Sequence, residues 1–295
     1  MKTFNKEPFV WFNPLNDYLF FKVMGEKGDE VQLLGFLNAV LGSSGKKQIE
    51  SLEIMENKSF LKDTIDGKSC VLDVLAVLND GTKVNIEVQL NNENSMDRRS
   101  LFYWSKVYSK SLKKGQDYCE LPNVIAINIV DFDFPRGGGV HTCFHLREDI
   151  DTSLIFSPAL EIHCINMVQW RKLKEKDVQN NPLHRWLIRF DKNSSQELVE
   201  EVVNMDSAIM AANEKMNDVL SDDEESENYW KREMARMDER GRLKYAHDEG
   251  FSEGREQGIE QGMIEIAQKL KARGHPLEEI AEVTGLSPEA IEKLD

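Results

Sequence analysis

Cysteine is scarce in this chain, and long apolar runs are missing. The 295 residues include only four cysteines, and these show no paired spacing. That scarcity argues against a disulfide framework and favours buried free thiols in a reducing compartment. No apolar stretch approaches the length of a membrane span, and the segment Met1 to Trp11 lacks the layout of a signal peptide. We therefore expect a cytoplasmic protein without a membrane partner.

A surplus of basic charge is also missing. The net charge of -15 looks unfavourable for contact with nucleic acid. However, residues 1–190 hold 24 Lys and Arg against 25 Asp and Glu, whereas residues 191–295 hold 13 against 27. The acidity therefore belongs to the C-terminal tail, and the preceding body is close to neutral. A hydrophobic content of 40% is enough for a packed core.

The most informative segment is residues 68–90, which reads as strand, turn and strand. A three-residue loop at Asn79 to Gly81, with Gly81 in the left-handed conformation, sets a register in which Asp73 lies directly opposite Glu87. A two-residue turn would instead place Asp73 among apolar side chains, where a lone carboxylate is costly. The three-residue loop is therefore preferred.

Two ionised carboxylates at this separation repel each other unless a cation lies between them. Oxygen-only ligands that leave room for water suit Mg²⁺ or Mn²⁺. Such an ion could activate a water molecule and polarise a phosphoryl oxygen, which is the chemistry of a nuclease. The alternative interpretation is that Asp73 and Glu87 lie on a solvated strand face.

A basic helix is expected after this hairpin and could hold DNA. Its cations recur at spacings of seven, four and three residues and would share one face: Arg99, Lys106, Lys110 and Lys113. Its apolar side chains would share another: Leu101, Trp104, Tyr108 and Leu112. The alternative is an ordinary amphipathic helix with a solvated basic side.

The wider pattern predicts an α/β fold with a mixed sheet flanked by helices on both sides. Helices are expected up to about residue 23 and over 31–41, and further strands over 51–55, 123–130, 140–146 and 160–167. A mostly helical tail should follow. The expected divisions are a body at 1–192, a helical acidic segment at 193–249, a glycine-repeat helix or linker at 250–274, and a small helix-turn-helix-like hairpin at 275–295.

With these residues in view, the chain resembles the PD-(D/E)XK nuclease superfamily and, within it, the bacterial recombination-promoting, transposase-like nucleases. The likeness covers roughly residues 13–170. It rests on motifs that occur in the family's order: 16–22 in the first helix, 66–68 and 72–73 before the turn, 80–81 in the turn, Ile86-Glu87-Val88-Gln89 after it, then Arg99, Tyr103 and Lys106, residues 115–118, and the strand 124–127.

The resemblance implies a restriction-endonuclease-like fold and a Mg²⁺-dependent or Mn²⁺-dependent DNA endonuclease connected with recombination or transposition. It implies that Asp73 and Glu87 bind the metal and that Asp17 is an extra acidic contributor. Gln89 stands where the superfamily usually has Lys. An amide can only hydrogen-bond, so a compensating cation such as Lys22, Arg99 or Lys106 is expected, and the opposing hypothesis is a catalytically weak or inactive adaptor that binds DNA or protein.

Three other patterns leave alternatives open. His141, Cys143 and His145 alternate along one strand and could hold zinc, but no second ligand pair lies nearby in sequence, so a partly buried strand face is preferred. Glycines recur every four residues from Gly250 to Gly262, which favours a soluble helix or a linker over self-association, although the tail remains a candidate for forming a homo-oligomer. The hairpin at 275–295 is too acidic to contact phosphates and suggests protein packing.

Overall fold

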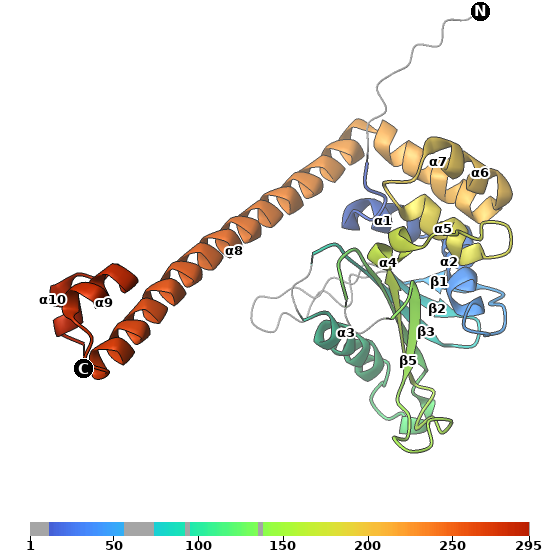
Figure 1. The fold of residues 1–295 in the computed structure, drawn as a ribbon. Coiled ribbons are helices and arrows are strands. Elements are labelled where there is room, and N and C mark those ends of the chain that lie inside the picture. Colours follow the sequence, from blue (N-terminus) through green and yellow to red (C-terminus); the bar gives the residue numbers. More distant parts are fainter. Residues whose placement is uncertain (1–11, 56–73, 92–94, 135–137, 295) are drawn as a thin grey trace, which may run out of the picture. The chain divides into compact units, whose positions relative to one another are not determined.

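The computed structural model describes residues 12–55, 74–91, 95–134 and 138–294 (Figure 1). It separates into two compact units, Met1–Glu233 and Met234–Asp295. Each unit is considered by itself below. The first unit contains the sheet and both of the polar clusters on which the functional argument depends.

The first unit is built on a mixed sheet of six strands in the order β1-β2-β3-β4-β6-β5. The strands are β1 (Leu52–Ile54), β2 (Val74–Leu78), β3 (Lys83–Gln89), β4 (Val124–Val130), β5 (His141–His145) and β6 (Leu160–Asn166). The central strands β3, β4 and β6 are parallel, and the pairs β1–β2, β2–β3 and β5–β6 are antiparallel. The strands expected at 51–55, 123–130, 140–146 and 160–167 are thereby confirmed.

The β2–β3 hairpin has the register that its turn chemistry predicts. Val74 pairs with Ile86, and Leu75 pairs with Asn85. The Leu78 amide donates to the Thr82 carbonyl at 2.8 Å. Gly81 has a φ of +84°, a left-handed value that a residue with a Cβ adopts only with strain. The three-residue loop is therefore confirmed for the described residues of the hairpin.

Helices cover both faces of this sheet, as the sequence predicts (Figure 1). The helices of the first unit are α1 (Asp17–Met24), α2 (Glu30–Gly42), α3 (Met96–Lys110), α4 (Met167–Lys172), α5 (Pro182–Phe190), α6 (Gln196–Met205) and α7 (Ser207–Ser221). The main core joins α1, α2, α5 and α7 to the face that carries Ile86 and Ile127. A smaller core joins Tyr103 and Val107 of α3 to the opposite face. The mixed sheet is thus a buried layer between two helical layers.

The helical segment expected at 193–249 is divided near its start. It begins as two helices, α6 and α7, because Asp206 leaves the helical conformation and its side chain caps α7 by accepting from the Ala208 amide at 3.0 Å. The expected end of the body at residue 192 stays a prediction. Ile209 and Met216 of α7 are fully buried in the main core, and the compact unit extends to Glu233.

The second unit is helical. It contains most of the 50-residue helix α8 (Asp223–Ala272), followed by α9 (Leu277–Thr284) and α10 (Pro288–Glu292). The repeated glycines lie inside α8, so this stretch is helical. Ile280 and Ile291 pack with Ala267 of α8 and give the terminal hairpin its own small core. Among the described residues, no helix is long and apolar enough to span a membrane.

Candidate active site

Glu87 occupies the centre of β3 and points to the face of the sheet that α3 covers. Only 2% of its surface is exposed. Asn85, two residues earlier on the same face, donates from Nδ2 to Glu87 Oε1 at 3.2 Å. Because successive strand residues alternate between faces, Gln89 shares this face as well. Asn85, Glu87 and Gln89 therefore form one polar row on this face of the sheet.

Asp73, the other predicted metal ligand, lies outside the described residues, as do the motif positions 66–68 and 72. The nearest described pair is Val74 with Ile86, whose register agrees with the prediction. The role of Asp73 consequently stays a prediction. Gln89 closes β3 beside Val130, and its carbonyl accepts from the Asp131 amide at 2.9 Å.

A polar residue on the neighbouring strand, Asn128, was not singled out from the sequence. Asn128 lies beside Glu87 in the parallel register and is 2% exposed. Its Nδ2 donates to Ser100 Oγ of α3 at 2.9 Å. The available signal was that Asn128 is the only polar residue in the strand Val124–Val130. Buried polar groups in an apolar layer require such partners, so Asn128 and Ser100 fix α3 over Glu87.

The oxygen chemistry of this row fits a hard divalent cation. Glu87 offers a carboxylate, and Asn85 Oδ1 is a buried amide oxygen that accepts no hydrogen bond from any described residue. Carboxylate and amide oxygens are ligands that Mg²⁺ and Mn²⁺ accept. Neither sulfur nor imidazole belongs to the row of Asn85, Glu87 and Gln89. The described part of the site therefore suits the expected metal class.

The expected basic helix exists as α3, but its faces differ from the prediction. The buried positions are Met96, Ser100, Tyr103 and Val107. Leu101, which was expected on the apolar side, is 47% exposed. The side of the helix that faces the sheet buries Met96, Tyr103 and Val107, and Ser100 on that side bonds to Asn128.

The predicted cations are distributed accordingly. Lys106 and Arg99 lie partly buried beside the aromatic rings of Phe102 and Tyr103, at 4.7 and 5.3 Å from the ring centroids. Lys110 is the last residue of the helix and is exposed. Lys113 lies beyond the helix end, so the predicted single helical face of four cations is wrong for Lys113. Their contact with DNA is not tested by this geometry.

Asp17 opens α1, whose apolar residues face the main core. Its carboxylate lies 4.0 Å from Arg232, and both side chains are more than half exposed. Lys22 in the same helix is paired with Glu26 and Glu225, each at 2.9 Å. These ion pairs occupy the ammonium group, so Lys22 is a poor candidate for the cation that would compensate for Gln89. Arg99 and Lys106 remain the candidates.

Another polar cluster lies on the other face of the sheet. Cys143, Glu161 and His163 bring one ligand atom each within 4.8 Å of one another. Glu161 and His163 align with Ile125 and Ile127, whereas Glu87 aligns with Asn128. This cluster therefore cannot share an ion with Glu87.

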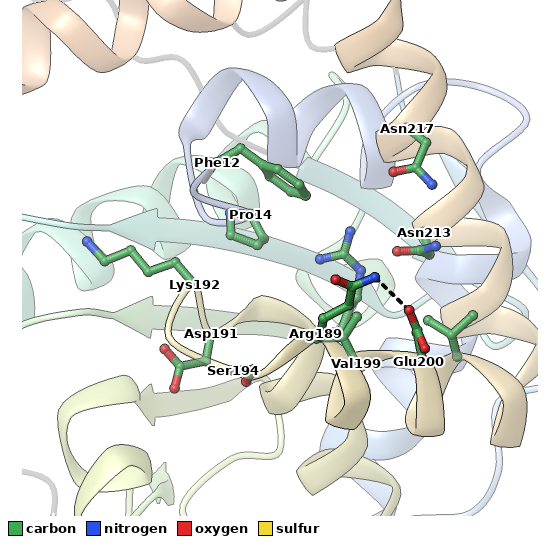
Figure 2. Close-up of a pocket in the computed structure, with 12 residues that line it drawn as sticks. Phe12, Pro14, Arg189, Asp191, Lys192, Ser194, Val199, Glu200, Asn213 and Asn217 are labelled. Atoms are coloured by element: carbon green, nitrogen blue, oxygen red, sulfur yellow. Dashed lines mark hydrogen bonds between the residues drawn. The ribbon is translucent and has the colours of Figure 1, made fainter. Parts of the chain in front are cut away.

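A cavity of about 270 Å³ lies elsewhere again (Figure 2). Its walls come from Phe12, from Arg189 of α5, and from α6 and α7, including Glu200 and Asn213. Arg189 is almost fully buried, and burial lowers the pKa of its guanidinium to about 10. No residue of the β2–β3 hairpin lines this cavity, so it is not the site around Glu87.

Comparison with known protein families supports the expected kinship. The family model of the PD-(D/E)XK nuclease family transposases matches residues 14–246. Comparisons with curated proteins and with solved structures gave no match. The matched range contains the whole sheet, the Ile86-Glu87-Val88-Gln89 motif and helix α3. The fold and the motif order agree with this match, and the chain belongs to the PD-(D/E)XK nuclease family transposases.

Proposed function

We propose that this protein is a DNA endonuclease that hydrolyses phosphodiester bonds with Mg²⁺ or Mn²⁺. One observation supports this proposal most strongly. Glu87, at the motif position of the PD-(D/E)XK family, is buried on β3, and Asn85 of the same strand donates a hydrogen bond to it. Continuing the described register by one residue would set Asp73 opposite Glu87. These two carboxylates are the proposed metal ligands.

Each residue has a defined task in this proposal. Asn85 Nδ2 orients the Glu87 carboxylate, and Asp73 completes the pair. When bound, the cation would supply a water of lowered pKa and polarise a phosphoryl oxygen. Gln89 would position that water by hydrogen bonding. It brings no positive charge to the developing oxyanion, so Arg99 or Lys106 of α3 would supply it. Asp17 is retained as a further acidic contributor.

DNA is the proposed substrate, and α3 with the turn after it is the proposed contact surface. Arg99, Lys106, Lys110 and Lys113 would bind phosphates, because Lys and Arg contacts to the backbone supply most of the sequence-independent affinity. Helix α3 packs over the face that carries Glu87, which would bring a bound strand near the metal ligands. A role in recombination or transposition, a cytoplasmic location and self-association through the tail belong to this proposal as expectations.

The test is cleavage of supercoiled plasmid DNA by the full-length protein with Mg²⁺ and with Mn²⁺. Glu87→Gln is nearly isosteric and preserves an oxygen that can accept from Asn85, so it should fold while losing the carboxylate. Asp73→Asn tests the partner. Glu53→Gln, at an exposed position of β1, is the matched control. We expect cleavage by the parent and the control only. Equal cutting by Glu87→Gln and Asp73→Asn would overturn the proposal.

A second candidate is a non-catalytic adaptor that retains the nuclease fold and binds DNA or protein. Two observations favour it: the amide of Gln89 replaces the usual lysine, and Glu87 is only 2% exposed, so a phosphate must displace covering groups to reach it. The adaptor predicts DNA retention without turnover at any metal concentration. Measuring binding and cleavage in the same salt series distinguishes the two candidates.

A further inference from the structure

The edge of the sheet carries a cluster of sulfur, nitrogen and oxygen ligands that the proposed nuclease chemistry does not use. Strands β5 and β6 are antiparallel, with Cys143 opposite His163 and His145 opposite Glu161. His163 is fully buried and Glu161 is 3% exposed. The second ligand pair, which is distant in sequence from the first, therefore reaches the same face through strand pairing.

The ligand atoms of Cys143, Glu161 and His163 all lie within 4.8 Å of one another. Cys143 Sγ lies 3.7 Å from His163 Nε2 and 3.9 Å from Glu161 Oε1. His145 Nδ1 lies 3.7 Å from the same sulfur. In a tetrahedral zinc site, a Zn–S bond of about 2.3 Å and a Zn–N bond of about 2.0 Å place sulfur and nitrogen about 3.6 Å apart. Both sulfur-to-nitrogen separations match that value.

A chain of hydrogen bonds fixes which nitrogen of His163 carries its proton. Ser43 Oγ donates to the Val40 carbonyl at 2.6 Å, so it accepts from His141 Nδ1 at 2.9 Å. A neutral His141 that donates from Nδ1 has its lone pair on Nε2, so Nε2 accepts. The group that donates to it is His163 Nδ1, at 2.8 Å.

This assignment leaves the lone pair of His163 Nε2 directed at a carboxylate. Glu161 Oε1 lies 2.7 Å from that nitrogen. A nitrogen and an oxygen this close are joined either by a proton, which makes a hydrogen bond, or by a metal ion that binds both atoms at about 2.0 Å from one side. The nearby thiol of Cys143 favours the metal, because sulfur is a weak partner for a proton and a strong ligand for zinc.

We propose that Cys143, Glu161 and His163 bind one Zn²⁺, with His145 as the fourth ligand. Binding converts the Cys143 thiol to a thiolate and releases its proton to solvent. Four protein ligands make a closed site, so the ion is structural and does not activate water. It would tie the edge strand β5 to β6.

Residues around the ligands complete the site. Lys46 binds the other oxygen of Glu161, and His145 Nε2 lies 3.5 Å from that oxygen. His141 holds the ring of His163 through the chain from Ser43. Such outer partners orient zinc ligands and fix their tautomers. Because Ser43 and Lys46 follow α2, the zinc site also anchors the end of that helix to the sheet edge.

The test is zinc binding by the full-length protein after chelator treatment, measured with zinc alone against a chromophoric competitor. We expect one zinc per chain, and a loss of affinity greater than about 100-fold in Cys143→Ser, since removal of even an outer partner commonly costs 10–100-fold. Cys119→Ser, at an exposed cysteine of a 3₁₀ turn, is the matched control and should bind as the parent does. Absence of stoichiometric zinc in the parent, or unchanged binding by Cys143→Ser, would overturn the site.

Cobalt substitution gives a readout that does not depend on the folding of one variant. Cobalt in the parent should show a sulfur-to-cobalt charge-transfer band, and the Cys119→Ser protein should retain it. The band should disappear in Cys143→Ser and weaken in His145→Ala, with circular dichroism confirming that each variant is folded. A cobalt spectrum without a sulfur band in the parent contradicts the assignment. Nuclease activity is not part of this readout, so the zinc site stands or fails separately from the proposed function.

Discussion

The two faces of the sheet each carry a buried polar cluster, and the clusters differ in the atoms that they offer. Glu87, Asn85 and Asn128 present carboxylate and amide groups beneath α3. On the other face, Cys143 and His163 add sulfur and imidazole nitrogen to the carboxylate of Glu161. Hard oxygen ligands select Mg²⁺ or Mn²⁺, and sulfur with imidazole selects zinc. One sheet can therefore hold two ions with separate tasks.

The two clusters are also fixed differently. Asn128 links the first to α3 through Ser100, so that cluster depends on a helix that lies across the sheet. The second depends on a strand at the sheet edge and on the turn after α2. A helix covering a site can shift to admit a substrate, whereas an edge strand must be held in register. This difference suits a catalytic role for the first cluster and a structural role for the second.

The largest expected effect separates the clusters directly. Glu87→Gln should lower metal-dependent DNA cleavage by at least about 100-fold, because it removes a ligand of the ion that stabilises the transition state. Its zinc content should be unchanged, since Glu87 points to the opposite face. Plasmid cleavage and zinc analysis on the same preparation check both halves. If Glu87→Gln lost both zinc and activity, the two clusters would not be independent.

The next effect concerns stability. Zinc at about 100 times its dissociation constant should raise the free energy of unfolding by about 2.7 kcal/mol, because the ion binds the folded state alone. Thermal unfolding with and without zinc measures this change. Cys143→Ser should abolish the gain, and Cys119→Ser should keep it. A zinc-dependent gain of equal size in Cys143→Ser would show that the ion binds elsewhere.

A smaller effect is expected from the surface of α3. Replacing Arg99, Lys106 and Lys110 with alanine should weaken DNA binding about 10-fold near physiological salt and reduce the steepness of its salt dependence, because fewer counterions are released. Anisotropy titrations over a range of salt concentrations provide the measurement. Alanine at Lys192, Lys231 and Arg232 gives a control of equal charge. An identical loss of DNA affinity in both triple variants would show that net charge, and not the position of the cations on α3, determines binding.

The smallest effect should come from Gln89→Lys. A lysine there supplies the charge that the family motif usually provides, so cleavage should rise by a few-fold to about 10-fold. Initial rates with Mg²⁺ measure the change, and Gln89→Met, which has no charge or hydrogen-bonding group, should lower the rate. A lysine variant slower than the parent would show that the amide is adapted to this site.

The sequence predicted the features whose causes are local. The turn at Asn79–Gly81 set the hairpin register through the left-handed Gly81, and alternation placed Glu87 with Asn85. Features that depend on tertiary partners were not predictable in the same way. The buried side of α3 is set by the part of the sheet against which Tyr103 and Val107 pack, and by the bond between Ser100 and Asn128; spacing within the helix does not reveal these partners.

The zinc cluster shows the same limit. The sequence showed one group of possible zinc ligands on a single strand: His141, Cys143 and His145. Glu161 and His163 alternate in the same manner on a strand further along the chain. Only the antiparallel register of β5 and β6 shows that Cys143 lies opposite His163. Helices α6 and α7 are separated at Asp206, whose side chain caps α7. The sequence did not reveal this break, because an aspartate can also lie within one continuous helix. The position of Asp73 remains a prediction from the register.

The most direct test of the account is a cleavage assay in which zinc-loaded protein, with and without added Mg²⁺, acts on supercoiled plasmid DNA. The account predicts cutting only when Mg²⁺ or Mn²⁺ is added, and its loss in Asp73→Asn and Glu87→Gln while Cys143→Ser still cuts. Undiminished cutting by Glu87→Gln, or no cutting by the parent with either metal, would contradict the central claim that Glu87 holds a catalytic cation.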